Sequence, residues 1–332
     1  MFIKTELIKL KNIRISKWVV IVLYFTLFNL SYFYAPESFY NDEKHILELM
    51  EYEFSFDGFS ITAYFYKFLL INITGVYINL ILLNILINYL MLKEIFKYNY
   101  YINLYIGLIY IIPAIFLSHL SKEIPVFLLI FIAVFTLQKY KYSKYIPLIF
   151  IAVFIRNYWV IIIISIIIIS LFAKSILAKF TYLIISNTFF ILIYEAILNK
   201  NTSDIRDALT NFRIEAIHSD SIISNLNYFN SGILNDLINY YYSILIILAP
   251  FVVVNQFKLQ YLILTFIQIF IIINILKINL HKFSKSDTYC LNIIISSLMT
   301  IIIFEPDLGS FSRHEFILFP FLVFLLNKNF NN

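Results

Sequence analysis

The chain has 332 residues, of which 61% are hydrophobic and 14% are charged, whereas about 25% of the residues of an ordinary soluble domain are charged. A soluble protein of this length keeps roughly a quarter of the surface of its unfolded chain in contact with water, so it could not hide this much apolar surface. Composition therefore excludes soluble enzymes and disordered chains, and the single cysteine, Cys290, excludes an internal disulfide framework. We expect an integral membrane protein.

The N-terminal end and the first polar segment predict opposite sides of the membrane. Four lysines and Arg14 precede the first apolar run, Trp18–Phe33, against one acid. Because cytoplasmic segments are enriched in Lys and Arg, this end is expected inside the cell. Residues 35–67 hold seven acids and two bases, and we expect them to form an outer loop with a short helix at His45–Glu51.

Nine further apolar runs follow along the chain: Phe68–Leu92, Ile102–Leu117, Ile124–Leu137, Tyr145–Ala173, Phe180–Leu198, Leu237–Val254, Tyr261–Leu276, Thr288–Phe304 and Phe316–Leu326. Since a helix needs about 20 residues to cross the bilayer, these runs predict an all-α, polytopic bundle of about nine to eleven spans. We expect one integral membrane domain over residues 1–332, with a second long polar loop at 199–236. The remaining lysines lie between apolar runs, which indicates topology signals rather than a nucleic-acid partner.

If every apolar run crosses the membrane once, the polar loops do not all fall on the side of the membrane that their charges predict. At least one run must therefore be broken or re-entrant. The candidates are Tyr145–Ala173, which Arg156 interrupts, and Leu237–Val254, which Pro250 interrupts. Tyr145–Ala173 is either one long tilted helix or two shorter pieces that meet at Arg156. Non-helical backbone at membrane depth is tolerated only where protein or a cavity surrounds it.

Arginines are scarce, and their positions point to a phosphate-bearing ligand. Apart from the N-terminal one, all lie at breaks or in polar segments: Arg156, Arg206, Arg213 and Arg313. Arginine grips phosphate with two parallel hydrogen bonds, whereas lysine acts as a point charge. The simpler alternative is structural pairing with neighbouring acids, which the sequence offers to the two arginines of the long loop but not to Arg156.

A first candidate motif is His119-Leu120-Ser121-Lys122-Glu123-Ile124-Pro125. In a functional interpretation, Lys122 neutralises a phosphate and Glu123 orients an acceptor. The structural alternative is an ordinary helix start, with Pro125 in the first turn and Glu123 favoured by the helix dipole.

A second candidate motif is the polar segment between the last two apolar runs, residues 305–315. Glu305 or Asp307 would act as a base, while Arg313 and His314 would hold an anion. Pro306 and Gly309 predict a tight turn here. The alternative is an interhelical turn with a charged cap.

Motifs for metals, nucleotides and serine nucleophiles are missing from the sequence. It contains no HExxH, no glycine-rich phosphate loop and no nucleophile elbow, and its five histidines are scattered. We therefore expect neither a metal nor another cofactor.

These features together resemble the Wzy-type polymerases of bacterial O-antigen and capsule repeat units. The likeness lies in the multispan, glycine-poor architecture and in three places: the Ser121–Glu123 turn before a span, Arg156-Asn157 at a membrane edge, and the final Glu305–His314 turn. More loosely, the chain is similar to other lipid-linked glycosyltransferases with GT-C-like folds. The large loop of the polymerase family would correspond to residues 199–236.

The resemblance implies a glycosyltransferase in the bacterial inner membrane, with its active site facing the periplasm. Such enzymes transfer a growing glycan from one undecaprenyl-pyrophosphate carrier to the non-reducing end of another repeat unit. The leaving pyrophosphate needs cations, expected from Lys122, Arg156, Arg206, Arg213 and Arg313. A base must accept the proton of the acceptor hydroxyl, and its candidates are Glu123, Glu305, Asp307 and His314. Expected partners are the lipid-linked oligosaccharide, the bilayer and a protein that regulates chain length.

Two alternatives belong to other classes. A GT-C glycosyltransferase that uses a polyprenyl-phosphate sugar would attach a single sugar, and acids of the first outer loop (Asp42, Glu43 or Asp57) would then be catalytic. A flippase for the same lipid-linked glycan would not be an enzyme, and it would predict an internal repeat, which the sequence does not show.

Overall fold

The computed structural model describes residues 13–35, 41–69, 71–95, 101–136, 142–198, 202, 232–248, 269, 271–273, 275–276, 278, 280, 283–305 and 308–331. The chain divides into two compact units. The first unit consists of Met1–Trp159 and Phe316–Asn332, and the second of Val160–Glu315. Predicted positions Arg206, Arg213 and Asp307 lie outside the described residues.

Four helices of the described part are long and apolar enough to cross a membrane: α2 (Lys17–Tyr34), α6 (Val76–Ile95), α12 (Ile176–Leu198) and α16 (Lys285–Phe304). Shorter apolar helices cover Ile106–Phe116, Glu123–Thr136, Ser143–Ile155, Trp159–Phe172 and Phe319–Lys328. The prediction of an all-helical fold is thereby confirmed, and the long helices indicate a membrane protein.

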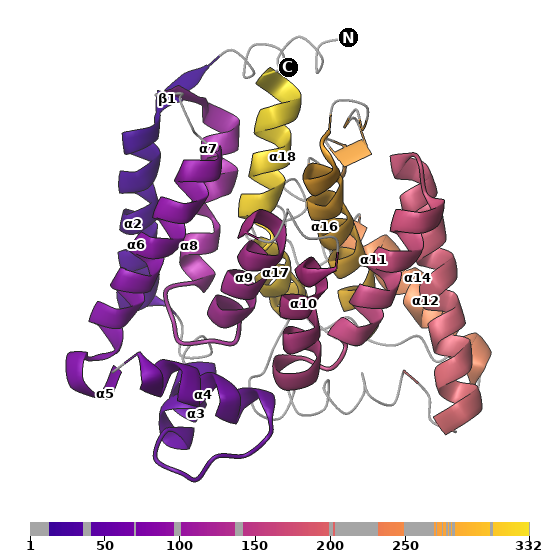
Figure 1. Cartoon of the computed structure of the whole chain (residues 1–332), viewed down its shortest axis with the longest axis horizontal. Coiled ribbons are helices and arrows are strands. Elements are labelled where there is room, and N and C mark those ends of the chain that lie inside the picture. Colours follow the sequence, from indigo (N-terminus) through magenta and orange to yellow (C-terminus); the bar gives the residue numbers. More distant parts are fainter. Residues whose placement is uncertain are drawn as a thin grey trace. The chain divides into compact units, whose positions relative to one another are not determined.

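The acidic segment after α2 folds into short helices rather than an open loop. These are α3 (Asn41–Leu49), α4 (Gly58–Phe68) and α5 (Ile71–Thr74), and α3 and α4 lie across the end at which α2 finishes (Figure 1). The predicted helix at His45–Glu51 is confirmed as far as Leu49, the last residue of α3, and Glu51 lies in the turn that follows. The predicted second span, Phe68–Leu92, begins later, at Val76, because Gly75 (φ +82°) ends α5 in a left-handed conformation.

The N-terminal end of α2 is joined by a two-stranded sheet to the segment that leads into the next helices. Strand β1 (Arg14–Ser16) pairs antiparallel with β2 (Tyr101–Asn103), so that Ile15 lies opposite Ile102. Helices α7 (Leu104–Ile111) and α8 (Pro113–Phe116) then follow α2 along its length. Gly107 permits this contact, because a Cβ there would lie 2.9 Å from Val20 Cγ2.

The long apolar run Tyr145–Ala173 is two pieces, which decides between the two predicted alternatives. Short helical segments η3 (Ser143–Tyr145), α10 (Ile146–Phe150) and η4 (Ile151–Ile155) precede the break, and α11 (Trp159–Phe172) follows it. Arg156 between them is extended, with φ −148° and ψ 98°. The remaining apolar helices of the first unit are α9 (Glu123–Phe131), its continuation η2 (Ile132–Thr136) and α18 (Phe319–Asn331).

In the second unit, α12 packs against α14 (Ile233–Leu248) and α16, and α14 also packs against α16. Gly309, predicted with Pro306 to form a tight turn, lies in the first turn of α17 (Leu308–Phe316), while Pro306 lies outside the described residues. Arg313 and His314 occupy the last turn of α17, where positive charge is favourable to the helix dipole.

Candidate functional site

The centre of the first unit is a short non-helical segment, residues 117–121, between α8 and α9. All five residues are buried, and none exposes more than 4% of its surface. A buried backbone outside a helix must find hydrogen-bond partners for its amide and carbonyl groups elsewhere. This requirement explains why side chains from several helices converge on the segment.

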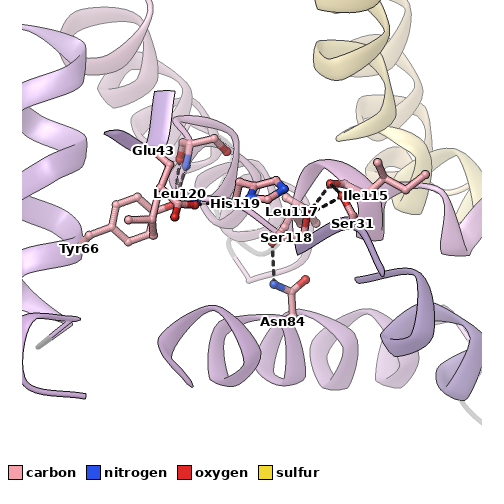
Figure 2. Close-up of polar contacts among 10 residues, drawn as sticks. Ser31, Glu43, Tyr66, Asn84, Ile115, Leu117, Ser118, His119 and Leu120 are labelled. Atoms are coloured by element: carbon pink, nitrogen blue, oxygen red, sulfur yellow. Dashed lines mark hydrogen bonds and ion pairs between the residues drawn. The ribbon is translucent and has the colours of Figure 1, made fainter. Parts of the chain in front are cut away.

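Four preceding helices supply these partners (Figure 2). The Asn84 amide in α6 donates to the Leu117 carbonyl at 2.9 Å. Ser118 Oγ donates to Ser31 Oγ in α2 at 2.9 Å, and Ser31 lies 2.9 Å from the Ile115 carbonyl. From α4, the Tyr66 hydroxyl donates to the Ser121 carbonyl at 2.9 Å. Side chains therefore take the place of the helical hydrogen bonds that this segment lacks.

Glu43 of α3 holds the middle of the segment. Its Oε2 accepts the Leu120 N–H at 3.1 Å and lies 3.5 Å from His119 Nδ1 (Figure 2). The His119 ring stacks on Tyr32 with centroids 5.8 Å apart. Because Glu43 and His119 are both buried, this contact fixes α3 to the segment that leads into α9.

Immediately after this segment, Glu123 begins α9 and forms an ion pair with Arg156. Glu123 Oε1 accepts from Arg156 Nη2, and the two side chains expose 1% and 10% of their surface. Arg156 Nη1 also donates to the Tyr158 hydroxyl at 2.7 Å. The predicted helix start at Glu123 is confirmed, and its carboxylate serves as the counterion of the arginine at the break.

Lys122 lies beside this ion pair with its ammonium 3.3 Å from the centre of the Phe59 ring in α4, a cation–π contact. Burial lowers the pKa of Lys122 to about 8, and the charge of Arg156 acts in the same direction. Asp42, Glu123 and Asp57 act in the opposite direction. These five side chains form what we term the Lys122 cluster: Asp42, Asp57, Lys122, Glu123 and Arg156.

The start of α4 fits tightly against this cluster. Asp57 caps α4 by accepting the amides of Phe59 and Ser60 at 2.8 and 3.0 Å. Burial alone would raise the pKa of Asp57, but these hydrogen bonds, one from Ser55, and the Lys122 charge hold it below its usual value. A Cβ on Gly58 would lie 2.2 Å from the Ile155 carbonyl, so only glycine permits this approach.

The predicted site residues thus fall into two groups. The structure brings Lys122, Glu123 and Arg156 together in the first unit. In the second unit Glu305 Oε1 and His314 Nε2 form a buried pair at 2.8 Å, and Arg313 lies half-buried in α17. Within the described residues, no group of three or more His, Cys, Asp or Glu side chains could hold a metal ion.

Sequence reasoning missed the contacts that join these residues. Phe59, Tyr66 and His119 were not proposed as site residues, and Glu43 was considered only with the acids of the first loop. A pattern could have indicated one part of the arrangement: Asp57 followed directly by Gly58 and a run of apolar residues is typical of a capped helix start.

The described residues form a helical protein with four candidate membrane-spanning helices and a cluster of opposite charges, in which Glu123 is buried, Asp42, Lys122 and Arg156 are half-buried and Asp57 is exposed. Compared with protein-family models, with curated proteins and with solved structures, the chain has no match in any of the three.

Proposed function

We propose that the chain is a membrane glycosyltransferase whose donor sugar is linked to a polyprenyl phosphate or pyrophosphate. One observation carries this proposal: the acidic segment after the first span folds back so that the Lys122 ammonium lies 3.3 Å from the ring centre of Phe59, the residue whose amide Asp57 caps. Cations for a leaving phosphate and a carboxylate for an acceptor hydroxyl are the two requirements of such a transfer.

In the proposed reaction, the bond between the anomeric carbon and the phosphate oxygen breaks and a new glycosidic bond forms to the acceptor oxygen. The phosphate leaves with the bonding electron pair, and Lys122 stabilises its negative charge. Asp42, which is half-buried, accepts the acceptor proton. Arg156 is held by Glu123, so it contributes positive potential from a fixed position.

Involvement of the first-loop acids favours transfer of a single sugar from a polyprenyl-phosphate donor. Polymerisation of undecaprenyl-pyrophosphate-linked repeat units is the second candidate. It is supported by the buried Glu305–His314 pair, which lies in the segment that carries the resemblance to the polymerases. In the polymerase, Glu305 or His314 would be the base and Arg313 would hold the pyrophosphate.

We also propose a GT-C-like arrangement of nine to eleven spans, with the Lys122 cluster facing the periplasm of a bacterial inner membrane. In this arrangement the four long helices of the described residues would be complete spans, and the five shorter apolar helices would be broken or re-entrant ones. Glu123–Thr136 and Ser143–Ile155 are shorter than the roughly 20 residues that cross a bilayer. If both helices reach the cytoplasmic boundary of the bilayer, the Glu123–Arg156 pair at their other ends lies inside the bilayer, below its outer boundary.

Deletion of the gene followed by mass spectrometry of lipid-linked glycans and gel analysis of surface polysaccharide tests this proposal. Single-sugar transfer predicts lipid-linked oligosaccharides that lack one sugar. Polymerisation predicts complete single repeat units and loss of the ladder. Unchanged glycans in both measurements would contradict the proposal as a whole.

Variants then locate the site. Lys122→Met and Asp42→Asn should each reproduce the deletion phenotype while the protein remains in the membrane. Lys44→Met and Glu51→Gln remove charges from exposed positions of the same segment and should preserve the product. Full activity of both cluster variants would show that the reaction takes place elsewhere.

A further inference from the structure

Three aromatic side chains of the first unit have no part in the proposed transfer step: Phe54, Phe56 and Tyr64. The first two lie in the loop 51–57 between α3 and α4, all seven residues of which are exposed. Phe56 exposes 84% of its surface and Phe54 exposes 44%. Large apolar side chains that gather at an open surface commonly mark an interaction site.

Phe54 is the centre of this group of rings, which we term the aromatic platform. Its ring centroid lies 5.0 Å from that of Phe56 and 4.9 Å from that of Tyr64 in α4. Both pairs are edge-to-face, with interplanar angles of 78° and 82°, a favourable geometry for aromatic contacts. The rings therefore support one another while Phe56 stays open to a ligand.

Hydrogen bonds fix the loop that carries the platform. The Lys67 ammonium donates to the Met50 carbonyl at 3.0 Å and lies 5.3 Å from the centre of the Tyr64 ring. The Ser55 amide, between the two phenylalanines, donates to Ser60 Oγ in α4 at 3.0 Å. A binding surface whose shape is already fixed loses less conformational freedom when a ligand binds.

The charge of the loop favours a sugar over the bilayer as the partner of the platform. Residues 51–57 contain Glu51, Glu53 and Asp57 and no base. Segments that bind a membrane surface are rich in Lys and Arg, because the headgroups of the surface are anionic. A sugar instead offers C–H groups that pack on an aromatic ring and hydroxyl groups that donate to a carboxylate, which is purely an acceptor.

The platform also adjoins the proposed transfer site. Phe56 precedes Phe59 by three residues, and the Phe59 ring contacts the Lys122 ammonium. The backbone between the two phenylalanines therefore spans no more than about 11 Å. A short oligosaccharide can bridge that distance.

We propose that Phe54, Phe56 and Tyr64 form a binding subsite for the oligosaccharide that accepts the transferred sugar. This inference rests on the proposed glycosyl transfer and defines its acceptor as a glycan of more than one sugar. The reacting sugar lies near Lys122, and the next sugar packs on the ring of Phe56.

Binding of oligosaccharide without turnover tests the subsite. The probe is the oligosaccharide pool released by mild acid from the lipid-linked glycans of the deletion strain. It is added to the purified full chain in phosphatidylcholine nanodiscs, and saturation-transfer NMR gives the dissociation constant. Phe56→Ala should weaken binding about fivefold to tenfold with an unchanged unfolding midpoint, because the side chain is exposed.

Two further variants define the role of the ring. Phe56→Trp keeps an aromatic face and should retain binding. The matched control Phe68→Ala removes a ring that is 83% exposed at the other end of α4, and it should bind oligosaccharide as the wild type does. Equal weakening by Phe68→Ala would mean that the platform is not the binding surface.

The outcomes separate this inference from the proposed function. Equal affinities of wild type and Phe56→Ala would overturn the subsite even if Lys122→Met abolishes the transfer. Binding that depends on Phe56, in a strain whose glycans the deletion leaves unchanged, would support an oligosaccharide site and contradict the transfer.

A spin label at position 56 distinguishes the sugar site from insertion into the bilayer. Phe56→Cys can be labelled selectively, because the native Cys290 is buried. Relaxation of the label by a water-soluble nickel complex supports the subsite. Relaxation mainly by oxygen, which concentrates in lipid, would place the ring in the bilayer and overturn the proposal.

Discussion

Glu123 and Arg156 are joined by a buried ion pair that connects the first residue of α9 to the break between η4 and α11. The pair thereby links the N-terminal end of α9 to the C-terminal end of η4 in the first unit. It also gives the arginine at the break a counterion 33 positions away in the chain.

Removal of either partner should destabilise the protein more than removal of both. Arg156→Ala leaves a buried carboxylate and Glu123→Ala leaves a buried guanidinium, and such losses typically cost about 3–5 kcal/mol. The double variant Arg156→Met/Glu123→Gln contains no unpaired charge and should recover part of that loss. Thermal unfolding in detergent provides the comparison. Equal, additive losses would mean that the two side chains act independently.

Gly58→Ala should disrupt the contact between α4 and the backbone before Arg156. The new methyl group would overlap with the Ile155 carbonyl, and overpacking typically costs about 1–3 kcal/mol. Gly107→Ala is the comparison, because its methyl group would lie 2.9 Å from Val20 Cγ2 and 3.5 Å from Ile15 Cγ2, which are side-chain atoms and can shift more easily than the backbone carbonyl that Gly58→Ala meets. The unfolding midpoint should fall further for Gly58→Ala. If both variants lose the same amount, α4 does not depend on this close approach.

Lys122 should make donor binding and stability respond to pH in opposite directions. Burial lowers its pKa from 10.5 to about 8, so the folded protein releases this proton before the unfolded chain does. Between about pH 8 and 10.5 the unfolded chain binds more protons, and the contribution of Lys122 to stability therefore rises with pH. Donor binding, which needs the ammonium, should fall as pH increases through 8.

The two effects are separated by comparison with Lys122→Met and Lys122→Arg. The pH-dependent stability difference between wild type and Lys122→Met should increase above pH 8. Lys122→Arg should bind donor without the loss at pH 8, because guanidinium stays charged. If the donor affinity of the wild type does not change across this pH range, Lys122 does not bind the phosphate of the donor.

Glu43→Ala and Glu43→Gln should differ although both remove the charge. Alanine leaves the buried Leu120 amide without its acceptor, and an unsatisfied buried group costs about 1–3 kcal/mol. Glutamine keeps an oxygen for this amide, so its effect on the unfolding midpoint should be smaller. Similar midpoints for the two variants would show that the charge facing His119, rather than the hydrogen bond to Leu120, holds α3 in place.

The helices were largely predictable from the sequence, whereas the site was only partly so. Apolar runs of suitable length indicate α2, α12 and α16, and an arginine within such a run indicates the break at residue 156. Contacts such as Glu123–Arg156 depend on which helix ends meet in space, which a single sequence does not contain. The late start of α6 was missed because Gly75 lies within an otherwise apolar run and only its left-handed backbone reveals the break.

The segment 117–121 takes its side-chain partners from Ser31, Glu43, Tyr66 and Asn84, all of which precede it in the chain. During synthesis these partners have already left the ribosome when residue 117 emerges. These four contacts of the buried segment can therefore form without a later helix. Glu123, by contrast, pairs with Arg156, which is synthesised 33 residues later. The contacts that hold residues 117–121 can therefore form during synthesis before the Glu123–Arg156 ion pair.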